Sequence, residues 1–314
     1  MKFPDRGTTL DLIKGSAATL TLFLAYVTFP LVGMIPGLFA PLPAIYYAVK
    51  SGKATGAAIV TVTIVVMVIL GDVAGAIFYL MQSGIISLAL PVFLSRRMGG
   101  GRAIAYTVAV NMVAIMLLAG AYGVSSGVNP HLQAKKVIAT SISQVAALYE
   151  QVGVKGDELK ALQQGMEQAG VLIGRIYPAL LVVSIACIVG LNLVMLAKFS
   201  ARLPGLQTNG DFKGFKNPEQ LVWVLIAAGF TMLFNDQQVT TVALNLLIVT
   251  VSLYFIQGLA IVTHFFARHA VPRFVRVLFY LFLAIQPYLA VVVAALGIFD
   301  LWGDFRSPKQ QENL

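Results

Sequence analysis

Long uncharged stretches dominate this chain and decide what it can fold into. The stretch 15–49 contains no charged residue, and the stretches 103–123 and 176–197 are also uncharged. Across 314 residues, 58% are apolar and only 11% are charged. A membrane-spanning helix needs about 20 mainly apolar residues to cross a hydrocarbon core roughly 30 Å thick. The sequence therefore predicts an all-α, polytopic helical membrane protein.

The lengths of the apolar blocks predict about eight or nine transmembrane helices. As one helix, the stretch 15–49 would be roughly 52 Å long, which is too long for a single crossing. The block 54–94 carries one charge, Asp72, near its middle, so it fits two spans that turn there. The predicted spans cover residues 10–31, 34–50, 54–71, 74–94, 103–123, 173–198, 219–235, 238–266 and 275–299.

The distribution of basic residues predicts the orientation. In a nine-span arrangement with a cytoplasmic N-terminus, most of the 22 lysines and arginines fall in inner segments. This matches the Lys/Arg bias of cytoplasmic loops. The arrangement puts the C-terminus outside, and the loss of one span would reverse that end. The basic inner face also accounts for the net charge of +9, so nucleic acid is not an expected partner.

The segment 124–172 is polar and patterned differently from the rest. Apolar residues recur there at steps of three and four, on one face of each of two predicted helices: Ile138, Ile142, Val145, Tyr149 and Val152, then Leu159, Leu162, Met166 and Ala169. This predicts an extramembrane amphipathic hairpin that turns near residues 153–156. It divides the chain into a membrane bundle 1–123, the hairpin 124–172 and a second bundle 173–314. The hairpin either packs on itself or lies at the outer membrane surface, or else it serves as a lid or a partner-docking element.

Few ionisable side chains lie inside predicted spans, and Asp72 is the clearest. A carboxylate within a membrane is costly, so it usually faces the bundle interior or water and is a functional candidate. At a turn between two spans, however, an aspartate is a plain interface residue. Both roles are open for Asp72, which we include among the candidate substrate-binding residues.

Amide side chains within spans complete the candidate set. They occur at Asn111, Asn192, Asn245, Gln257 and Gln286. Between membrane helices such amides often bond to one another. Gln286 precedes a proline, which frees a backbone carbonyl as in the broken helices that form solute sites. Asn245 and Gln257 would point about 120° apart on one helix. The predicted substrate-binding residues are Asp72, Asn245, Gln257 and Gln286.

The sequence contains no motif for several common kinds of chemistry. Residues 51–54 are only a fragment of a P-loop, so the chain has no such site for ATP. His131, His264 and His269 are not spaced with carboxylates or thiols as zinc ligands would be. There is no Ser-His-Asp set, no paired catalytic carboxylates and no haem pattern. We therefore expect no enzyme activity, no metal and no cofactor.

Five motifs in the C-terminal third carry a resemblance. They are Asn217-Pro218-Glu219, Leu244-Asn245-Leu246, Tyr254-Phe255-Ile256-Gln257-Gly258, Leu296-Gly297-Ile298-Phe299-Asp300 and Trp302-x-Asp304-Phe305-Arg306. With the hairpin, they resemble the YybS-like family of uncharacterised bacterial membrane proteins. The resemblance implies a location in the bacterial inner membrane. It also implies a distant similarity to the substrate-binding S components of energy-coupling-factor transporters, which capture vitamins and pair with separate ATPases, but no ligand residues carry over.

Two functions fit these observations. In the first, the protein is an S-component-like subunit that binds a small solute, and a separate ATPase module supplies any energy. In the second, it is a membrane scaffold or assembly factor that recognises another membrane protein through its outer hairpin or its basic cytoplasmic face. The expected partners are the lipid bilayer, an unknown small solute, and either the ATPase module or the recognised protein.

Overall fold

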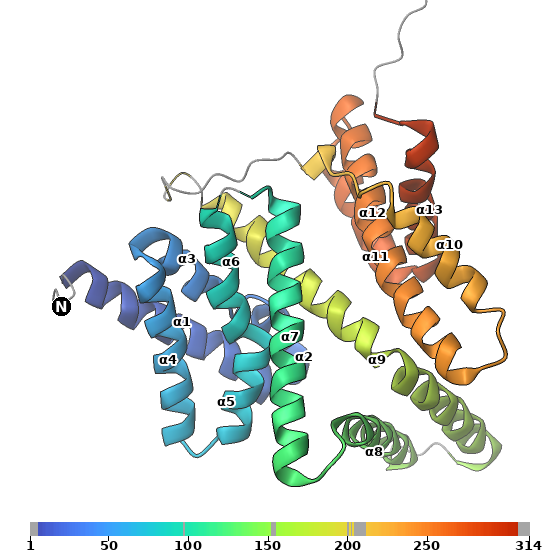
Figure 1. Ribbon diagram of the computed structural model, residues 1–314, viewed down its shortest axis with the longest axis horizontal. Helices are drawn as coiled ribbons and strands as arrows, with labels where there is room; N and C mark the ends of the chain where they lie inside the picture. The colour runs from blue at the N-terminus through green and yellow to red at the C-terminus, as the bar shows by residue number, and fades with distance from the viewer. Residues whose placement is uncertain are drawn as a thin grey trace, which may run out of the picture. The chain divides into compact units, whose positions relative to one another are not determined.

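The structure is a computed structural model, which describes residues 6–96, 98–151, 155–199, 201, 203 and 212–306. Every secondary-structure element within these ranges is helical (Figure 1), which confirms the predicted all-α class. Contacts divide the chain into two compact units. Unit 1 comprises Met1–Gln133 and Ser184–Asn209, and unit 2 comprises Ala134–Val183 and Gly210–Leu314.

Six helical stretches of the described residues are long and apolar enough to cross a membrane. They are α1 (Arg6–Thr28), the stretch Val32–Ser51 from α2 (Pro30–Gly37) and α3 (Leu42–Ser51), the stretch Val73–Ser95, α7 (Gly100–Ser126), α9 (Gly156–Lys198) and α11 (Gln237–Arg268). The bent pair α12 (Arg273–Ile285) and α13 (Pro287–Gly303) is a seventh if it counts as one span. The polytopic class is confirmed, with six or seven candidate spans instead of eight or nine.

Two predicted spans form apolar helices of fewer than 18 residues, which are shorter than the six candidate spans. Helix α4 (Lys53–Ile69) has 17 residues and α10 (Leu221–Thr231) has 11. At 1.5 Å per residue they are about 25 and 16 Å long. The sequence limits the length of α10 at both ends: Asn217 and Pro218 precede it, and the polar run Asn235–Gln238 follows it.

The predicted ninth span, 275–299, is broken. Helices α12 and α13 meet at an angle of 109°. Gln286 at the break has an extended conformation, with φ −107° and ψ 100°. The ring of Pro287 disfavours a helical residue before it, and proline has no N–H to continue the helical bonds. The break therefore follows directly from the Gln-Pro sequence.

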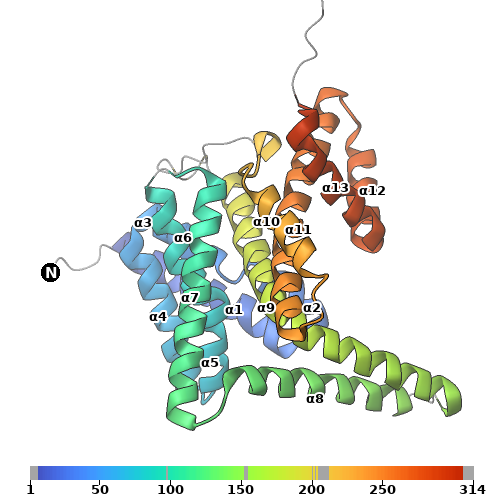
Figure 2. The same ribbon diagram turned by 45° about the vertical axis from the view of Figure 1, so that its right-hand side comes forward.

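Unit 1 is a bundle in which α1, α3, α4 and α7 surround a helix with a π-helical turn. This helix consists of α5 (Val73–Tyr79), the π turn η1 (Leu80–Gly84) and α6 (Ile85–Ser95). Helices α4, α6 and α7 run side by side (Figures 1 and 2). Phe23 of α1 packs edge-on against Tyr79, with ring centroids 5.2 Å apart, and both side chains are fully buried. This contact places the π turn in the interior of the unit.

Unit 2 contains the hairpin and the C-terminal helices. In α8 (Pro130–Gln151), Ile138 and Ile142 are half-buried, and Ile142 packs against Gly170 of α9. Val145 and Tyr149 of the predicted apolar face are exposed, and Val152 lies outside the described residues. Helix α9 runs unbroken from Gly156 to Lys198. The second hairpin helix and the span 173–198 are therefore one helix, and the predicted three-part division stays a prediction.

Candidate functional site

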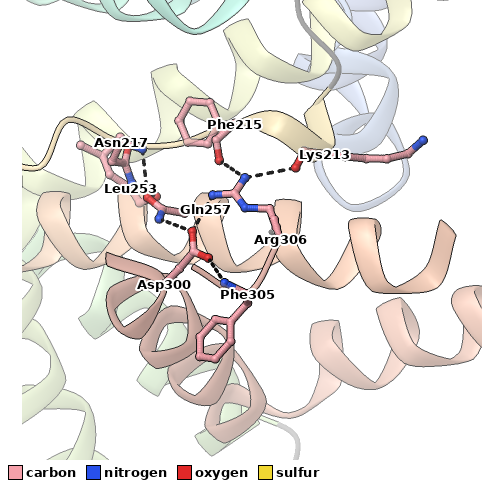
Figure 3. Close-up of polar contacts among 8 residues, drawn as sticks. All are labelled: Lys213, Phe215, Asn217, Leu253, Gln257, Asp300, Phe305 and Arg306. Carbon is pink, nitrogen blue, oxygen red and sulfur yellow. Dashed lines mark hydrogen bonds and ion pairs between the residues drawn. The ribbon is translucent and has the colours of Figure 1, made fainter. Parts of the chain in front are cut away.

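The polar side chains of unit 2 close around one buried carboxylate. Asp300 of α13 is 0% exposed. Its Oδ2 accepts hydrogen bonds from Nε2 of Gln257 on α11 (3.0 Å) and from Nη2 of Arg306 (2.5 Å). Its Oδ1 accepts one from the backbone N–H of Phe305 (3.2 Å), as Figure 3 shows. A carboxylate is tolerated in a protein interior when it is paired and hydrogen-bonded in this way.

The same network fastens the segment before α10. Nη1 of Arg306 donates to the backbone carbonyls of Lys213 (3.1 Å) and Phe215 (2.8 Å). Oε1 of Gln257 accepts from the backbone N–H of Asn217 (2.9 Å), and Nδ2 of Asn217 donates to the carbonyl of Leu253 (2.9 Å). We call Asn217, Gln257, Asp300 and Arg306 the Asp300 latch. It joins four of the five family-like motifs, from three separate parts of the chain.

Two glycines allow the latch to form. A Cβ atom on Gly258 of α11 would overlap the carbonyl oxygen of Val293, and one on Gly297 of α13 would overlap the carbonyl oxygen of Tyr254. The two helices therefore touch backbone to backbone, as small residues permit in membrane proteins. Gln257 and Asp300 flank this contact, which brings their side chains within hydrogen-bonding distance.

The latch bears on the predicted position of the C-terminal end. The nine-span arrangement puts segment 198–216 inside and the C-terminus outside. Arg306 bonds to the carbonyls of Lys213 and Phe215, so these residues lie next to each other in unit 2. The 109° bend makes α12 and α13 either a broken span or a re-entrant loop, and the orientation stays a prediction.

Asn245, a predicted binding residue, repairs the backbone hydrogen bonding beside Pro178 within the continuous helix α9. Pro178 cannot donate a helical hydrogen bond, and its ring disturbs the preceding turn. Nδ2 of Asn245 donates to the carbonyl of Arg175 (2.8 Å), while its Oδ1 accepts from the N–H of Ala179 (2.8 Å). The amide is thus inserted between the two groups that would bond to each other in a regular helix. Nδ2 also donates to the Thr241 carbonyl of its own helix (2.8 Å).

The remaining predicted residues lie elsewhere. Asp72 caps the N-terminus of α5, where its Oδ1 accepts from the N–H of Gly75 (2.7 Å), so the carboxylate occupies a turn. Gln286 is exposed at the bend between α12 and α13. Asp72 belongs to unit 1 and the other three residues to unit 2, where no two of them share a hydrogen-bond partner among the described residues; their role in substrate binding stays a prediction. Asn245 and Gln257 both belong to α11, but Asn245 bonds to α9 and Gln257 to α13, as their spacing predicts.

Unit 1 presents the opposite situation around its π turn. Four buried side-chain oxygens there have no hydrogen-bond partner among the described residues. They are the hydroxyls of Tyr79 and Ser83, Oε1 of Gln82 and Oδ1 of Asn111. The Tyr79 hydroxyl lies near the side chain of Thr63, whose own hydroxyl donates to the Ile59 carbonyl (2.8 Å). Nδ2 of Asn111 on α7 donates to the carbonyl of Met81 (3.1 Å), which ties α7 to the π turn. We call Tyr79, Gln82, Ser83 and Asn111 the π-turn site.

Unpaired buried oxygens have an energetic cost that a ligand can remove. Each unsatisfied group costs about 1–3 kcal/mol, and native proteins normally satisfy such groups with water, an ion or a ligand. Single π turns inside α-helices also occur frequently at functional sites. Further unpaired oxygens of unit 1 belong to Ser16, Thr19 and Asn192. Unit 1 therefore contains several buried oxygens that its described residues leave without a hydrogen-bond partner.

Of the π-turn site, Asn111 alone was predicted from the sequence, as one of several amides within the spans. A usable signal exists, because Gln82-Ser83-Gly84 is a polar triplet in the middle of the apolar stretch 74–94. The chemistry of the site is that of neutral oxygens. Within the described part of the chain, no group of three or more His, Cys, Asp or Glu side chains could hold a metal ion.

Comparisons with known proteins cover both units. A family model described as "Predicted membrane protein (DUF2232)" matches residues 17–301. The uncharacterised protein YybS of Bacillus subtilis (strain 168) is 26% identical over 294 residues, which are 90% of this chain and 92% of that protein. No solved structure matches this chain. The family match includes the π-turn site and reaches Asp300, whereas Arg306 lies just beyond it.

Proposed function

Since this chain belongs to the DUF2232 family of predicted membrane proteins, to which the YybS-like resemblance pointed, we propose that it binds a small polar solute within unit 1. The observation that supports this function is the π-turn site. Its four buried oxygens have no hydrogen-bond partner among the described residues. A solute that supplies donors to these oxygens removes their desolvation cost and is bound in return.

The π-turn site favours a neutral, donor-rich solute. Gln82 and Asn111 offer carbonyl oxygens, which only accept hydrogen bonds, whereas the hydroxyls of Tyr79 and Ser83 can also donate. None of these side chains carries a permanent charge. An anion would lack a counter-charge there, and burying an unpaired charge is costly. The solute class is therefore a small molecule with several N–H or O–H groups.

We propose that the protein acts as an S-component-like binding subunit of the bacterial cytoplasmic membrane. It would bind without catalysing a reaction, and a separate ATPase module would supply energy for any transport. Counting α4 and α10 as short spans gives eight crossings with the N-terminus in the cytoplasm. This topology puts the segment before α10 and Arg306 on the cytoplasmic side, which agrees with the Lys/Arg bias of inner loops.

The experiment that tests solute binding compares molecules carried by the purified protein. The double variant Tyr79→Phe/Ser83→Ala removes two oxygens of the π-turn site with little change in volume. Ser143→Ala, on the hairpin, is the matched control because Ser143 bonds only to the local carbonyl of Thr140. Small molecules are released by denaturation and identified by mass spectrometry against a detergent blank.

A compound that copurifies with the wild-type protein and the Ser143→Ala control is expected. Its occupancy in the double variant is expected to fall about tenfold, because each lost hydrogen bond contributes about 0.5–1.5 kcal/mol. Equal retention by the double variant would disprove binding at the π turn. The absence of any compound above the blank, under mild extraction, would count against the whole function.

A second function is supported by the hairpin. Helix α8 has no buried residue, and Leu132, Val137 and Leu148 expose large apolar side chains. We propose, as the alternative, a scaffold that docks another membrane protein on α8. Substitution of Val137 and Leu148 by Ser should then abolish cross-linking of α8 to that protein in intact cells and leave solute retention unchanged. Unchanged cross-linking would exclude this docking surface.

A further inference from the structure

A basic hollow lies on unit 2 beside the Asp300 latch. It has a volume of about 390 Å³ and is lined by Lys213, Gly214, Lys216, His264, Asp304 and Arg306. Arg306 is paired with Asp300, so the remaining charges are those of Lys213, Lys216 and Asp304, which sum to a net positive charge. We propose that it binds the phosphate group of an anionic phospholipid.

The latch prepares Arg306 for this role. Its contacts with Asp300 and with the carbonyls of Lys213 and Phe215 hold the guanidinium in one orientation. These contacts use at most three of its five N–H donors, which leaves at least two for a phosphate oxygen. A fixed guanidinium binds a phosphate with little further loss of side-chain freedom.

Lys216 and His264 supply the other contacts. Lys216 is exposed and has neither an ion-pair nor a hydrogen-bond partner among the described residues. His264 enters from α11, one turn before Arg268 at the end of that helix. Asp304 brings the single negative charge into the hollow. The donors therefore come from three parts of unit 2, which is a better fit to a phosphate group than a row of lysines on one helix face.

The surroundings of the hollow favour a lipid over a soluble phosphate. Three exposed aromatic residues are near lining residues in the chain: Phe212 and Phe305 directly adjoin them, and Trp302 lies two residues before Asp304. Trp302 is 70% exposed, and tryptophan is enriched where membrane proteins meet the headgroup layer. In membrane proteins, basic pockets at the headgroup layer bind lipid headgroups. A phospholipid can use both features, with its phosphate in the hollow and its acyl chains along the apolar residues.

The test measures lipid binding to the full-length, delipidated protein by native mass spectrometry. The probes are phosphatidylglycerol, phosphatidylcholine, and inorganic phosphate with glycerol phosphate as soluble forms. The double variant Lys216→Gln/His264→Gln alters the hollow but keeps the latch intact. The control variant Lys136→Gln removes an exposed charge on α8, outside the hollow.

The wild-type protein is expected to bind phosphatidylglycerol at least fivefold more tightly than phosphatidylcholine. The double variant should lose about fivefold in affinity for phosphatidylglycerol, as expected for the removal of one surface charge, and the control should lose less than twofold. An equal loss in the control would show general charge attraction and overturn the proposal. Binding of the soluble phosphates with the same sensitivity to the double variant, without a preference for phosphatidylglycerol, would overturn the lipid assignment.

Discussion

The two units differ in how completely their buried polar groups are hydrogen-bonded. In unit 2, the carboxylate of Asp300 and the amides of Gln257 and Asn217 find partners on neighbouring elements, and among its described buried side-chain atoms the Tyr254 hydroxyl alone lacks one. In unit 1, the π-turn site leaves four buried oxygens without partners among the described residues. A completed network holds helices in place, because any movement separates charged and hydrogen-bonded groups. An incomplete network can accept hydrogen bonds from a bound molecule, so under the proposed function the comparison separates a structural region from a binding region.

The largest expected effect comes from opening the latch. Asp300→Ala leaves the guanidinium of Arg306, which is only 12% exposed, without its counter-charge. Breaking one partner of a buried pair costs about 3–5 kcal/mol. Thermal unfolding in detergent should show this loss. Asp157→Ala, at a fully exposed carboxylate of the hairpin, is the control and should change little. A stable Asp300→Ala protein would mean that unit 2 does not depend on its closed network.

The next effect concerns the other satisfied amide of unit 2. Asn245→Leu removes the bonds to the Arg175 carbonyl and the Ala179 N–H, and leaving these backbone groups unpaired should cost about 1–3 kcal/mol each at most. In a Pro178→Ala background, α9 can form its own hydrogen bonds, so the same change should cost much less. Unfolding of the four proteins in this double-mutant cycle measures the coupling. Equal costs in both backgrounds would refute the repair role of Asn245.

A smaller effect is expected at Asp72, a satisfied group of unit 1. Asp72→Ala removes the N-cap of α5 and should destabilise the protein by about 1 kcal/mol. Asp72→Asn keeps an acceptor for the Gly75 N–H and should restore most of that stability, although it removes the charge. If instead Asp72→Asn is as damaging as Asp72→Ala, the charge itself matters and the capping role is insufficient.

The smallest effect has the opposite sign and gives the sharpest contrast. Ser83→Ala removes a buried hydroxyl that has no partner among the described residues. In protein stripped of bound solute, the change should leave stability unaltered or raise it by up to about 1 kcal/mol, since a desolvation cost disappears. Ser87→Ala is the matched control, because that hydroxyl donates to the Ser83 carbonyl (2.8 Å) and its loss should destabilise. Destabilisation by Ser83→Ala to the same extent would remove the distinction between the units.

Much of the architecture could be predicted from the sequence, because hydrocarbon thickness sets the length of apolar stretches. The separation of Asn245 and Gln257 on α11 also followed from helical geometry alone. The difference in the span count came from α4 and α10, which are shorter than predicted, and from the Gln286–Pro287 break. Its proline was recognised, but the size and direction of the bend depend on tertiary packing.

The functional groups were harder to predict for two physical reasons. Asn217, Gln257 and Asp300 were visible as parts of motifs, yet more than 40 residues separate each of the first two from the third. The backbone contact between Gly258 of α11 and Gly297 of α13 brings Gln257 and Asp300 together, and it is visible only in the folded structure. Gln82 and Ser83 were missed because an α-helical repeat does not reveal a π turn, which changes the direction of every side chain after it.

The latch also has a consequence for biosynthesis. Chains emerge from the ribosome N-terminus first, so the segment 212–217 and Gln257 reach the membrane before Asp300 and Arg306 exist outside the ribosome. Until α13 is synthesised, Gln257 lacks its bond to Asp300, and the segment 212–217 lacks its bonds to Arg306. Chains that stop short of Asp300 should therefore be degraded by membrane proteases much faster than the full-length protein.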